Sequence, residues 1–303
     1  MRKSRIAGAF AGIAIAALAL TACNSGTPGA DPASPGGDGE TTENPWTVAT
    51  DVSLEGSPTF DAISERGKVR IGVKEDQPNL GYLDPTSGAR SGFDVDIARW
   101  IAASLGYDEA DLEFTAIDSN NREQAIINGD IDYYVGTYSI TDDRKERISF
   151  AGPYFITGQG LLVAADNDTI TGLESITADM TICSVTGSTS IERIKTETPA
   201  NTEEFSKYSE CVEALKGGQV DAVTTDEAIL IGYAATDPQN LKVTGEVFSE
   251  ERYGVGVTKG DTAFQEFVNT MFTDGGEVWQ AIFDKNLGPA GVTGTQPAVD
   301  PVG

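Results

Sequence analysis

The sequence contains no histidine, so it lacks the side chain that most often serves as a general base and as a metal ligand. It has three cysteines, which form no zinc pattern because they are widely spaced and histidine is absent. Basic residues are scarce, since 21 Lys and Arg stand against 47 Asp and Glu, a net charge of −26. This charge argues against a nucleic-acid partner, which needs a basic surface. We expect no catalytic residue, metal or cofactor.

Long apolar runs are also scarce, and the clearest one lies at the N-terminus. Ile6 to Leu20 is apolar, but it is shorter than the ~20 residues that a membrane-spanning helix needs. Basic residues precede it, and it ends in Leu20-Thr21-Ala22-Cys23, which resembles the lipobox of bacterial lipoproteins. The resemblance implies a signal peptide at 1–22, cleavage before Cys23 and a diacylglyceryl thioether on its sulfur. An ordinary signal peptide followed by a chance cysteine is the alternative.

The segment that follows is rich in Gly, Pro, Ser, Thr and Asp and has almost no apolar side chains up to Pro45. Such a chain cannot bury enough surface to order itself. We therefore expect 23–58 to be a lipidated flexible tether that holds a globule at the outer face of the cell membrane. At 303 residues, the chain is long enough for that globule to contain two domains.

One stretch, Gly129 to Arg144, carries the strongest local pattern. It is typical of a buried strand that ends in hydroxyl-bearing residues and turns at Thr141, a good N-cap, into a short charged helix. Thr137, Ser139 and Arg144 then meet near the C-terminal end of a strand, where open α/β sheets bind ligands. An arginine fork matches a carboxylate. A surface arginine paired with an acidic neighbour is the alternative.

A second copy of this pattern occurs later in the chain. Residues 125–132 align with 214–221, each the end of an apolar helix, a glycine and the start of a strand. In this register Asp226 falls opposite Thr137, so one unit offers a hydroxyl beside a cation and the other an anion. A zwitterionic ligand between two lobes would satisfy both. The alternative is that the repeat shows two α/β sheets and nothing about a ligand.

The remaining pattern predicts alternating strands and helices, which indicates mainly parallel sheets with right-handed crossovers. Asp94 is expected to cap a helix, 75–92 to be a loop, and the hydroxyl-rich loop 186–190 to open a helix whose free N–H groups favour anions. We place a first lobe at 59–158 and 253–288, a second lobe at 159–252, and a disordered tail at 289–303.

Two cysteines remain once Cys23 is acylated. An exported chain meets an oxidising compartment, which favours a disulfide between Cys183 and Cys211 within the second lobe. Two buried free thiols are the alternative.

Four motifs together resemble the signatures of solute-binding protein family 3, the polar amino-acid receptors of ABC importers. They are Gly92-Phe93-Asp94-Val95-Asp96, Gly129-Asp130-Ile131-Asp132, Ser139-Ile140-Thr141-Asp142-Asp143-Arg144 and Phe150-Ala151-Gly152-Pro153-Tyr154. The resemblance covers about residues 60–288. It implies the α/β, two-lobed periplasmic-binding-protein type II fold, in which each lobe is a mostly parallel sheet flanked by helices and two hinge crossings join the lobes.

The resemblance also implies roles for individual residues. Arg144 matches the clamp for the α-carboxylate, helped by Thr137, Ser139 and Thr189, and Asp226 matches the partner of the α-ammonium group. The lipobox and the cysteine pair resemble glutamate-binding lipoproteins of Gram-positive importers.

Two further cations are candidates for the ligand's side chain. Lys74 ends the first strand, and Arg122 lies in a turn like that of the acidic-amino-acid subgroup. They would bind the second carboxylate of glutamate. The alternatives are a solvated strand end for Lys74 and an ion pair within the lobe for Arg122. Tyr82 and Tyr133 are candidates for an apolar wall.

We therefore expect a monomeric, membrane-anchored receptor that captures glutamate or aspartate and presents it to an ABC permease. A receptor for glutamine or asparagine, and a ligand-sensing subunit of a membrane signalling system, are the alternatives. A dehydratase acting on cyclic acids is a third, although no histidine or activated nucleophile supports it.

Overall fold

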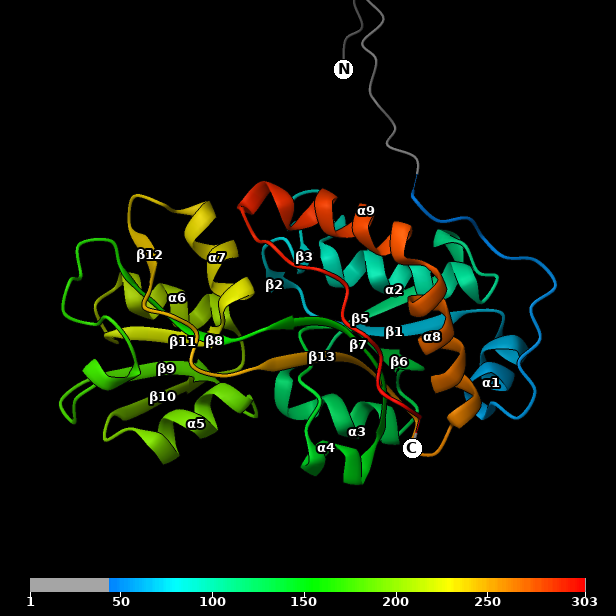
Figure 1. Ribbon diagram of the computed structural model, residues 1–303, viewed down its shortest axis with the longest axis horizontal. Coiled ribbons are helices and arrows are strands. Elements are labelled where there is room, and N and C mark those ends of the chain that lie inside the picture. The colour runs from blue at the N-terminus through cyan, green and yellow to red at the C-terminus, as the bar shows by residue number, and fades with distance from the viewer. Residues whose placement is uncertain (1–43, 303) are drawn as a thin grey trace, which may run out of the picture. The chain divides into compact units, whose positions relative to one another are not determined.

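A computed structural model describes residues 44–302 of the chain. The signal peptide expected at 1–22 and the acylated Cys23 lie outside the described residues. The described part contains two five-stranded sheets with helices packed on them, and these form two lobes (Figure 1). None of the helices between residues 44 and 302 is both long and apolar enough to cross a membrane.

The first lobe is built on a sheet with the strand order β5-β1-β6-β13-β7. β1 runs parallel to β5 and β6, whereas β13 is antiparallel to β6 and β7. The apolar residues Val69, Ile71 and Val73 of β1 are fully buried, as expected for a central strand covered on both faces. The strands are β1 (Val69–Val73), β5 (Leu112–Ala116), β6 (Tyr133–Tyr134), β7 (Ser149–Thr157) and β13 (Glu251–Val257).

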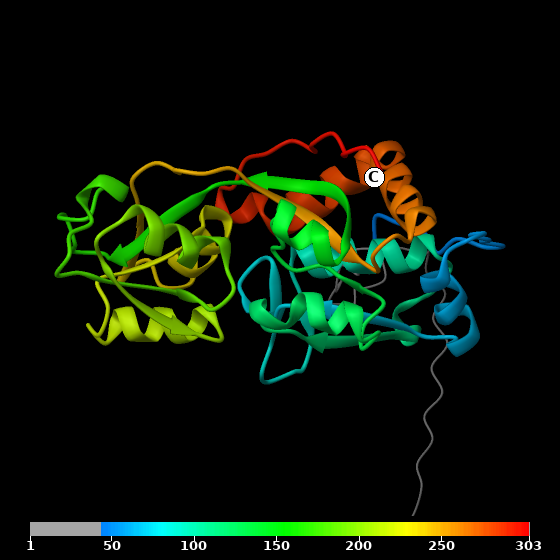
Figure 2. The ribbon, with the colours of Figure 1, turned by 90° about the horizontal axis from the view of Figure 1, so that it is seen from below.

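Helices cover both faces of this sheet (Figure 2). Ile97 and Ile101 of α2 and Leu105 at its C-cap recur at helical spacing and are buried, so this apolar stripe forms where the sequence predicts it. The helices are α1 (Pro58–Arg66), α2 (Phe93–Ser104), α3 (Arg122–Ile127), α4 (Asp142–Arg147), α8 (Thr262–Asp274) and α9 (Gly276–Asn286), with 3₁₀ turns η1 (Glu109–Asp111), η2 (Ser119–Asn121) and η4 (Gly288–Ala290).

The start of α2 differs from the prediction. Gly92, not Asp94, occupies the N-cap position, and Asp94 lies fully buried in the first turn. Its carboxylate accepts hydrogen bonds from the backbone N–H of Thr137 and from the hydroxyl of Tyr154, both at 2.8 Å. Asp94 therefore holds the chain that follows β6 instead of capping its own helix.

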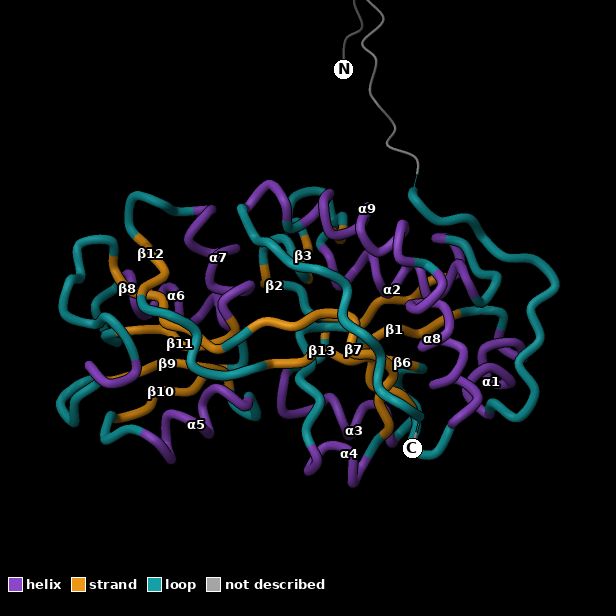
Figure 3. The backbone as a smooth tube through the Cα atoms, in the orientation of Figure 1, coloured by secondary structure: helices purple, strands orange, loops and turns teal. Residues whose placement is uncertain are grey.

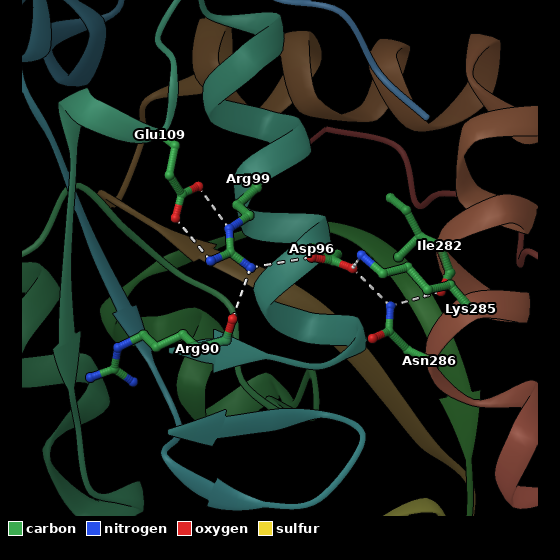
Figure 4. A network of polar contacts seen from close by, with 7 residues as sticks. All are labelled: Arg90, Asp96, Arg99, Glu109, Ile282, Lys285 and Asn286. Carbon is green, nitrogen blue, oxygen red and sulfur yellow. Dashed lines mark hydrogen bonds and ion pairs between the residues drawn. The ribbon is translucent and has the colours of Figure 1, made fainter. Parts of the chain in front are cut away.

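A buried carboxylate fastens α9 to α2 (Figure 4). Asp96 of α2 accepts from Lys285 at 2.8 Å and from Asn286 at 2.9 Å, and Arg99 approaches its other oxygen at 3.3 Å. The side chain of Asp96 is almost completely buried. Because a buried carboxylate must be paired, this network fixes the C-terminal helix against the first lobe.

The second lobe has a sheet with the order β10-β9-β11-β8-β12, in which β9, β10 and β11 are parallel and β8 is antiparallel to its neighbours. Its elements are β8 (Gln159–Ala164), η3 (Leu173–Ser175), β9 (Thr181–Val185), α5 (Thr189–Glu197), β10 (Asn201–Phe205), α6 (Tyr208–Lys216), β11 (Ala222–Asp226), α7 (Glu227–Thr236) and β12 (Leu241–Thr244). The Cys183–Cys211 disulfide is confirmed and joins β9 to α6.

Four short or polar strands were not predicted. The expected loop 75–92 contains a small antiparallel sheet made of β2 (Asp76–Gln77), β3 (Gly81–Leu83) and β4 (Arg90–Ser91). Strands of two or three residues carry no periodic pattern. β10 is polar because it lies at the edge of its sheet and is partly exposed.

Two connections join the lobes (Figure 3). β7 continues through Gly158 into β8, and the chain returns from β12 to β13, which pairs with β7. The two connections pass very close to each other, since a Cβ on Gly158 would lie 2.5 Å from the carbonyl oxygen of Ser249. Glycine at this position permits that approach.

The C-terminal boundary of the tether expected at 23–58 is wrong, because residues 46–58 pack on the first lobe, whereas residues 23–43 lie outside the described part of the chain. Trp46 and Leu54 pack against the core of the first lobe. The N–H of Ala49 donates to the carbonyl of Ala103 at the end of α2, at 2.9 Å. Residues 46–58 therefore belong to the first lobe, held there by two apolar side chains within a polar segment.

The disordered tail expected at 289–303 is likewise corrected, because the C-terminal segment 289–302 packs along β7 and β13 (red in Figures 1 and 2). Asp300 is its main anchor. Its backbone N–H donates to Gly152 at 2.7 Å, its carbonyl accepts from Asn269 at 2.9 Å, and its carboxylate pairs with Arg252 at 2.5 Å. The segment has no periodic apolar pattern and contains five Gly and Pro among its 14 residues, so the sequence does not reveal these specific contacts.

Candidate ligand-binding site

A small cavity lies between the two lobes, and every side chain that lines it is polar or aromatic. Its volume is about 10 Å³, so the lobes are closed on each other. The first lobe contributes Ser119, Arg122, Thr137, Ser139 and Arg144, and the second contributes Ser188, Thr189, Ser190, Tyr208 and Asp226. The structure thus brings together all of the predicted ligand-binding residues except Lys74.

Arg144 is fixed by the short helix that the sequence predicts. The hydroxyl of Thr141 caps α4 by accepting from the backbone N–H of Arg144 at 3.3 Å. The guanidinium donates to the carbonyl of Ser139 at 2.7 Å and lies 3.5 Å from the carboxylate of Glu123. Burial, and then the charge of Arg122, lower the pKa of Arg144 to about 10, so it remains a cation at neutral pH.

Arg122 lies beside Arg144 on one aromatic ring. The guanidinium carbon of Arg122 is 4.1 Å from the ring centre of Tyr138, and that of Arg144 is 5.0 Å from it. The tyrosine hydroxyl donates to Glu123 at 2.6 Å. Cation–π attraction and this carboxylate offset the repulsion between two buried like charges.

The guanidinium groups of Arg122 and Arg144 also donate hydrogen bonds to the second lobe. Arg122 and Arg144 both donate to the carbonyl of Gly187, at 3.3 and 3.1 Å. Gly187 has a left-handed φ of 78°, and a Cβ there would lie 2.8 Å from the Cα of Asn120. The backbones of the two lobes therefore lie in close contact at this glycine.

Thr137 is held in an unusual conformation for a threonine, with a φ of 46°. Asp94 accepts its N–H, and Gln77 donates to its hydroxyl oxygen at 3.1 Å. Because that oxygen already accepts from Gln77, the hydroxyl proton is free to be donated into the cavity.

The start of α5 forms the facing wall. Ser188 caps the helix by accepting from the N–H of Ile191 at 3.1 Å. The N–H groups of Thr189 and Ser190 belong to the first turn, which has no intrahelical acceptors for them. The hydroxyl of Ser190 is buried and has no hydrogen-bond partner among the described residues. This wall offers donors to an anion.

Asp226 ends β11 and occupies the N-cap position of α7, although its side chain makes no capping hydrogen bond, and it lines the cavity. One carboxylate oxygen accepts from the hydroxyl of Tyr253 at 2.6 Å, and the other is buried without a partner among the described residues. Burial, and then the charge of Glu251, raise the pKa of Asp226 to about 7. An unpaired buried carboxylate of this kind is suited to a cationic group.

Lys74 is the exception among the predicted residues, because it lies behind the cavity wall. Its ammonium group donates to the hydroxyl of Ser119 at 2.8 Å and to the carbonyl of Ile117 at 3.2 Å. The side chain is packed beneath Gly81, whose hypothetical Cβ would lie 2.9 Å from that of Lys74. Burial, and then the charge of Arg122, lower the pKa of Lys74 to about 7. It reaches the cavity only through Ser119.

The candidates for an apolar wall are wrong. Tyr133 is buried in the core of the first lobe, where its hydroxyl donates to Ala98, and Tyr82 lines a different surface groove. Tyr208 of α6 lines the cavity instead. Sequence analysis also missed Ser119, Ser188 and Ser190. The two later serines lie in the predicted anion-friendly loop, but no local pattern points to Tyr208.

A second group of contacts joins the closed lobes outside the cavity. Asp76 of β2 accepts from the backbone N–H of Ser209 at 3.0 Å and lies 3.2 Å from the hydroxyl of Tyr233. Glu75 pairs with Lys207 at 2.5 Å. The closed arrangement therefore has contacts of its own, in addition to those around the cavity.

The family model for bacterial extracellular solute-binding proteins, family 3, matches residues 69–288. A glutamate-binding protein, GluB, of Corynebacterium efficiens is 38% identical over 299 residues, covering 94% of this chain and 91% of that protein. A glutamine-binding protein of Geobacillus stearothermophilus is 41% identical over 205 residues, covering 67% of this chain and 78% of that protein.

Among solved structures, an ancestral arginine-binding protein bound to arginine is 33% identical, with a TM-score of 0.66, and covers 73% of this chain and 98% of that one. The expected periplasmic-binding-protein type II fold is confirmed by these similarities and by the two helix-flanked sheets. Since the family model spans both lobes, the chain belongs to the bacterial extracellular solute-binding proteins, family 3.

Proposed function

We propose that this protein captures an acidic amino acid, glutamate or aspartate, between its lobes by hinge closure and presents it to an ABC permease. One observation carries the proposal: two guanidiniums of the first lobe and an unpaired carboxylate oxygen of the second line the same cavity. A zwitterion matches this arrangement. The ligand would favour the closed state through contacts with both lobes.

The α-carboxylate and the α-ammonium group of the ligand would contact most of the residues that line the cavity. Arg144, the hydroxyl of Thr137 and the first-turn N–H groups of α5 would bind the α-carboxylate. Asp226 would accept from the α-ammonium group through its unpaired oxygen. Ser139 lies beside Arg144 and would complete the set.

Arg122 and Lys74 remain for the side chain of the ligand. Arg122 lines the cavity directly, and Lys74 acts through the hydroxyl of Ser119. A second carboxylate near Ser119 would raise the pKa of Lys74 and keep its ammonium group charged. The similarity to GluB of Corynebacterium efficiens supports glutamate.

A receptor for glutamine or asparagine is the second candidate. The indirect position of Lys74 and its pKa of about 7 favour it, since a neutral amine suits an amide. The similarity to a glutamine-binding protein adds support. The relatives named here are binding proteins, which favours a receptor over a dehydratase.

Thermal unfolding of the purified protein with each of the twenty amino acids tests the proposal, because a ligand that binds only the native state raises Tm. We expect the largest increase with glutamate or aspartate. An increase confined to glutamine and asparagine would establish the second candidate, and no increase with any amino acid would contradict both.

Replacing one cation then tests the side-chain assignment. Lys74→Met should weaken glutamate binding about tenfold and glutamine binding little, because only glutamate has a second carboxylate to lose its partner. Isothermal titration calorimetry gives both affinities. Lys242→Met, in which a partly exposed lysine of the second lobe is changed, is the matched control. Equal losses for both ligands would reject the assignment.

We further propose that Cys23 carries the lipid anchor at the outer face of the membrane. Radiolabelled palmitate should be incorporated into the natural protein but not into Cys23→Ser.

Uptake of labelled glutamate in a deletion strain distinguishes an ABC permease from a membrane signalling protein as the partner. Lost uptake indicates a permease, whereas unchanged uptake with a lost transcriptional response indicates a signalling receptor.

A further inference from the structure

Glu251 is a buried carboxylate that stands behind the cavity and is absent from its lining. It is the first residue of β13, at the second crossing between the lobes. One of its oxygens accepts from the hydroxyl of Ser249 at 2.9 Å, and Ser249 accepts in turn from the N–H of Gln159 at 3.0 Å. Both hinge connections therefore hold this carboxylate in place.

The other oxygen of Glu251 faces the cavity wall, where it accepts from the hydroxyl of Thr189 at 3.1 Å. A carboxylate can only accept hydrogen bonds, so the threonine must donate its single hydroxyl proton to Glu251. The oxygen of Thr189, which lines the cavity, is then left with lone pairs alone. Toward a ligand this hydroxyl is an acceptor, while the backbone N–H of Thr189 remains a donor.

Tyr253, the next residue on the same face of β13, orients a second acceptor in a similar way. Side chains two positions apart point to the same side of a strand, so Tyr253 follows Glu251. Its hydroxyl occupies one oxygen of Asp226 and leaves the other without a partner. The hinge strand thus prepares two acceptors, on Thr189 and Asp226. The charge of Glu251 also contributes to the raised pKa of Asp226, a repulsion that a bound cation would relieve.

We propose that Glu251 is a positioning residue that makes the hydroxyl of Thr189 an acceptor for the ligand's ammonium group. Together with Asp226 it makes the amine a requirement for tight binding. The inference rests on the proposed function, an α-amino acid bound in this cavity, and adds how the site rejects dicarboxylic acids without an amine.

A purely structural role of Glu251 in the hinge predicts a different result. Loosening the hinge would weaken every ligand of similar shape by the same factor, because closure is common to all of them. A positioning role instead changes the discrimination between glutamate and glutarate, which differ by the amine alone. The ratio of their dissociation constants is therefore the informative measurement.

Calorimetric titration of the natural protein, Glu251→Gln and Glu250→Gln provides that ratio. A carboxamide can donate as well as accept, so it no longer dictates the direction of the Thr189 hydroxyl. We expect the glutarate-to-glutamate ratio to fall about tenfold in Glu251→Gln, from loss of a charge-assisted contact. Glu250 is exposed, and its variant should keep the natural ratio.

Thr189→Val gives a second route that leaves the hinge intact. It should lower the ratio of the glutarate and glutamate dissociation constants about tenfold. The double variant should show no further fall, because both changes remove the same contact between the Thr189 hydroxyl and the ammonium group. An unchanged ratio in either single variant would overturn the inference, as would equal weakening of both ligands. If the natural protein binds no amino acid at all, the proposed function fails instead.

Discussion

The two lobes are stabilised in different ways. Among residues 44–302, every pair of contacting aromatic rings belongs to the first lobe, where Phe93 packs edge-to-face with Phe155, Trp279 and Phe283. The second lobe has the Cys183–Cys211 disulfide instead. Buried rings stabilise the folded chain directly, whereas a disulfide acts mainly by restricting the unfolded chain. The second lobe alone therefore depends on the redox state of its surroundings.

The lobes also contribute opposite and unequal halves to the cavity. The cations of the first lobe are already partnered, with Arg122 and Arg144 resting on Tyr138 and donating to carbonyl groups. Among the described residues that line the cavity, the buried side-chain atoms without a hydrogen-bond partner belong to the second lobe, on Ser190 and Asp226. The first lobe is thus a preorganised template for an anion, and the second bears an electrostatic cost that a ligand's ammonium group would remove.

The largest expected effect concerns the template. Arg144→Ala should weaken binding of every α-amino acid by about 4 kcal/mol, because a buried ionic contact common to all of them is lost. Calorimetry with glutamate and glutamine measures this loss. Arg147→Ala, a change at an exposed arginine of the same helix, should leave both affinities unchanged. Retention of glutamate affinity in Arg144→Ala would exclude this residue from the binding role.

The next effect separates the two modes of stabilisation. Replacing Cys183 and Cys211 by alanine should lower the free energy of unfolding of the second lobe by about 3 kcal/mol. All three tryptophans, Trp46, Trp100 and Trp279, pack in the first lobe, so their fluorescence reports on it alone. During urea unfolding, circular dichroism should show an early transition that fluorescence lacks. Coincident transitions would show that the lobes unfold as one unit.

A smaller effect concerns the destabilisation that results from burying the ionised carboxylate of Asp226. Its pKa is raised from 3.8 to about 7 by burial, so the folded protein holds this proton more tightly than the unfolded chain does. The contribution of Asp226 to the free energy of unfolding is therefore most favourable below pH 3.8 and decreases as the pH rises toward 7. Asp226→Asn should be more stable than the natural protein by roughly 2 kcal/mol at pH 8 and no more stable at pH 4.

The same variant should bind glutamate more weakly, since it would lose the carboxylate that we propose as the partner of the ligand's ammonium group. In the natural protein, glutamate affinity should decline as the pH falls below about 7, where Asp226 becomes protonated. Chemical denaturation across this pH range, with and without glutamate, measures both trends. A variant that is destabilised at pH 8 would show that Asp226 is satisfied in the free protein.

The smallest effect tests the contact between the lobes. Gly187→Ala would place a Cβ against Asn120, so closure and glutamate affinity should be impaired about tenfold. Gly218→Ala is a matched control, because that glycine also has a left-handed φ but has no neighbour within 4 Å of the added atom. Equal losses in the two variants would assign the effect to backbone strain. Small-angle scattering would detect the more open average shape.

The parts of the site that the sequence predicts depend on short-range geometry. The Thr141 cap and its short helix place Arg144, and the end of β11 places Asp226. Both features arise within a few residues, so periodicity and cap chemistry suffice to find them. The repeated helix-glycine-strand unit then relates one strand end to the other.

The parts that the sequence did not predict depend on contacts between distant segments. Lys74 lies at the expected strand end, but the packing of Gly81 over it and the position of Ser119 keep it behind the wall. Tyr208 lines the cavity from α6, far along the chain from the first-lobe residues that line its other side. Aspartate is a common N-cap residue, yet the carboxylate of Asp94 accepts a hydrogen bond from the backbone N–H of Thr137 instead. No local pattern contains these partners.

The position of the C-terminal segment matters for engineering this receptor as a biosensor. Asp300 is bonded to Gly152 and Arg252, which belong to the two strands β7 and β13 that lead into the second lobe. A fluorescent protein fused shortly after Asp300 would therefore pull on the strands that the proposed hinge closure would bend. Such a fusion should alter the signal by itself, so a reporter inserted in an exposed turn far from these strands would give a cleaner readout.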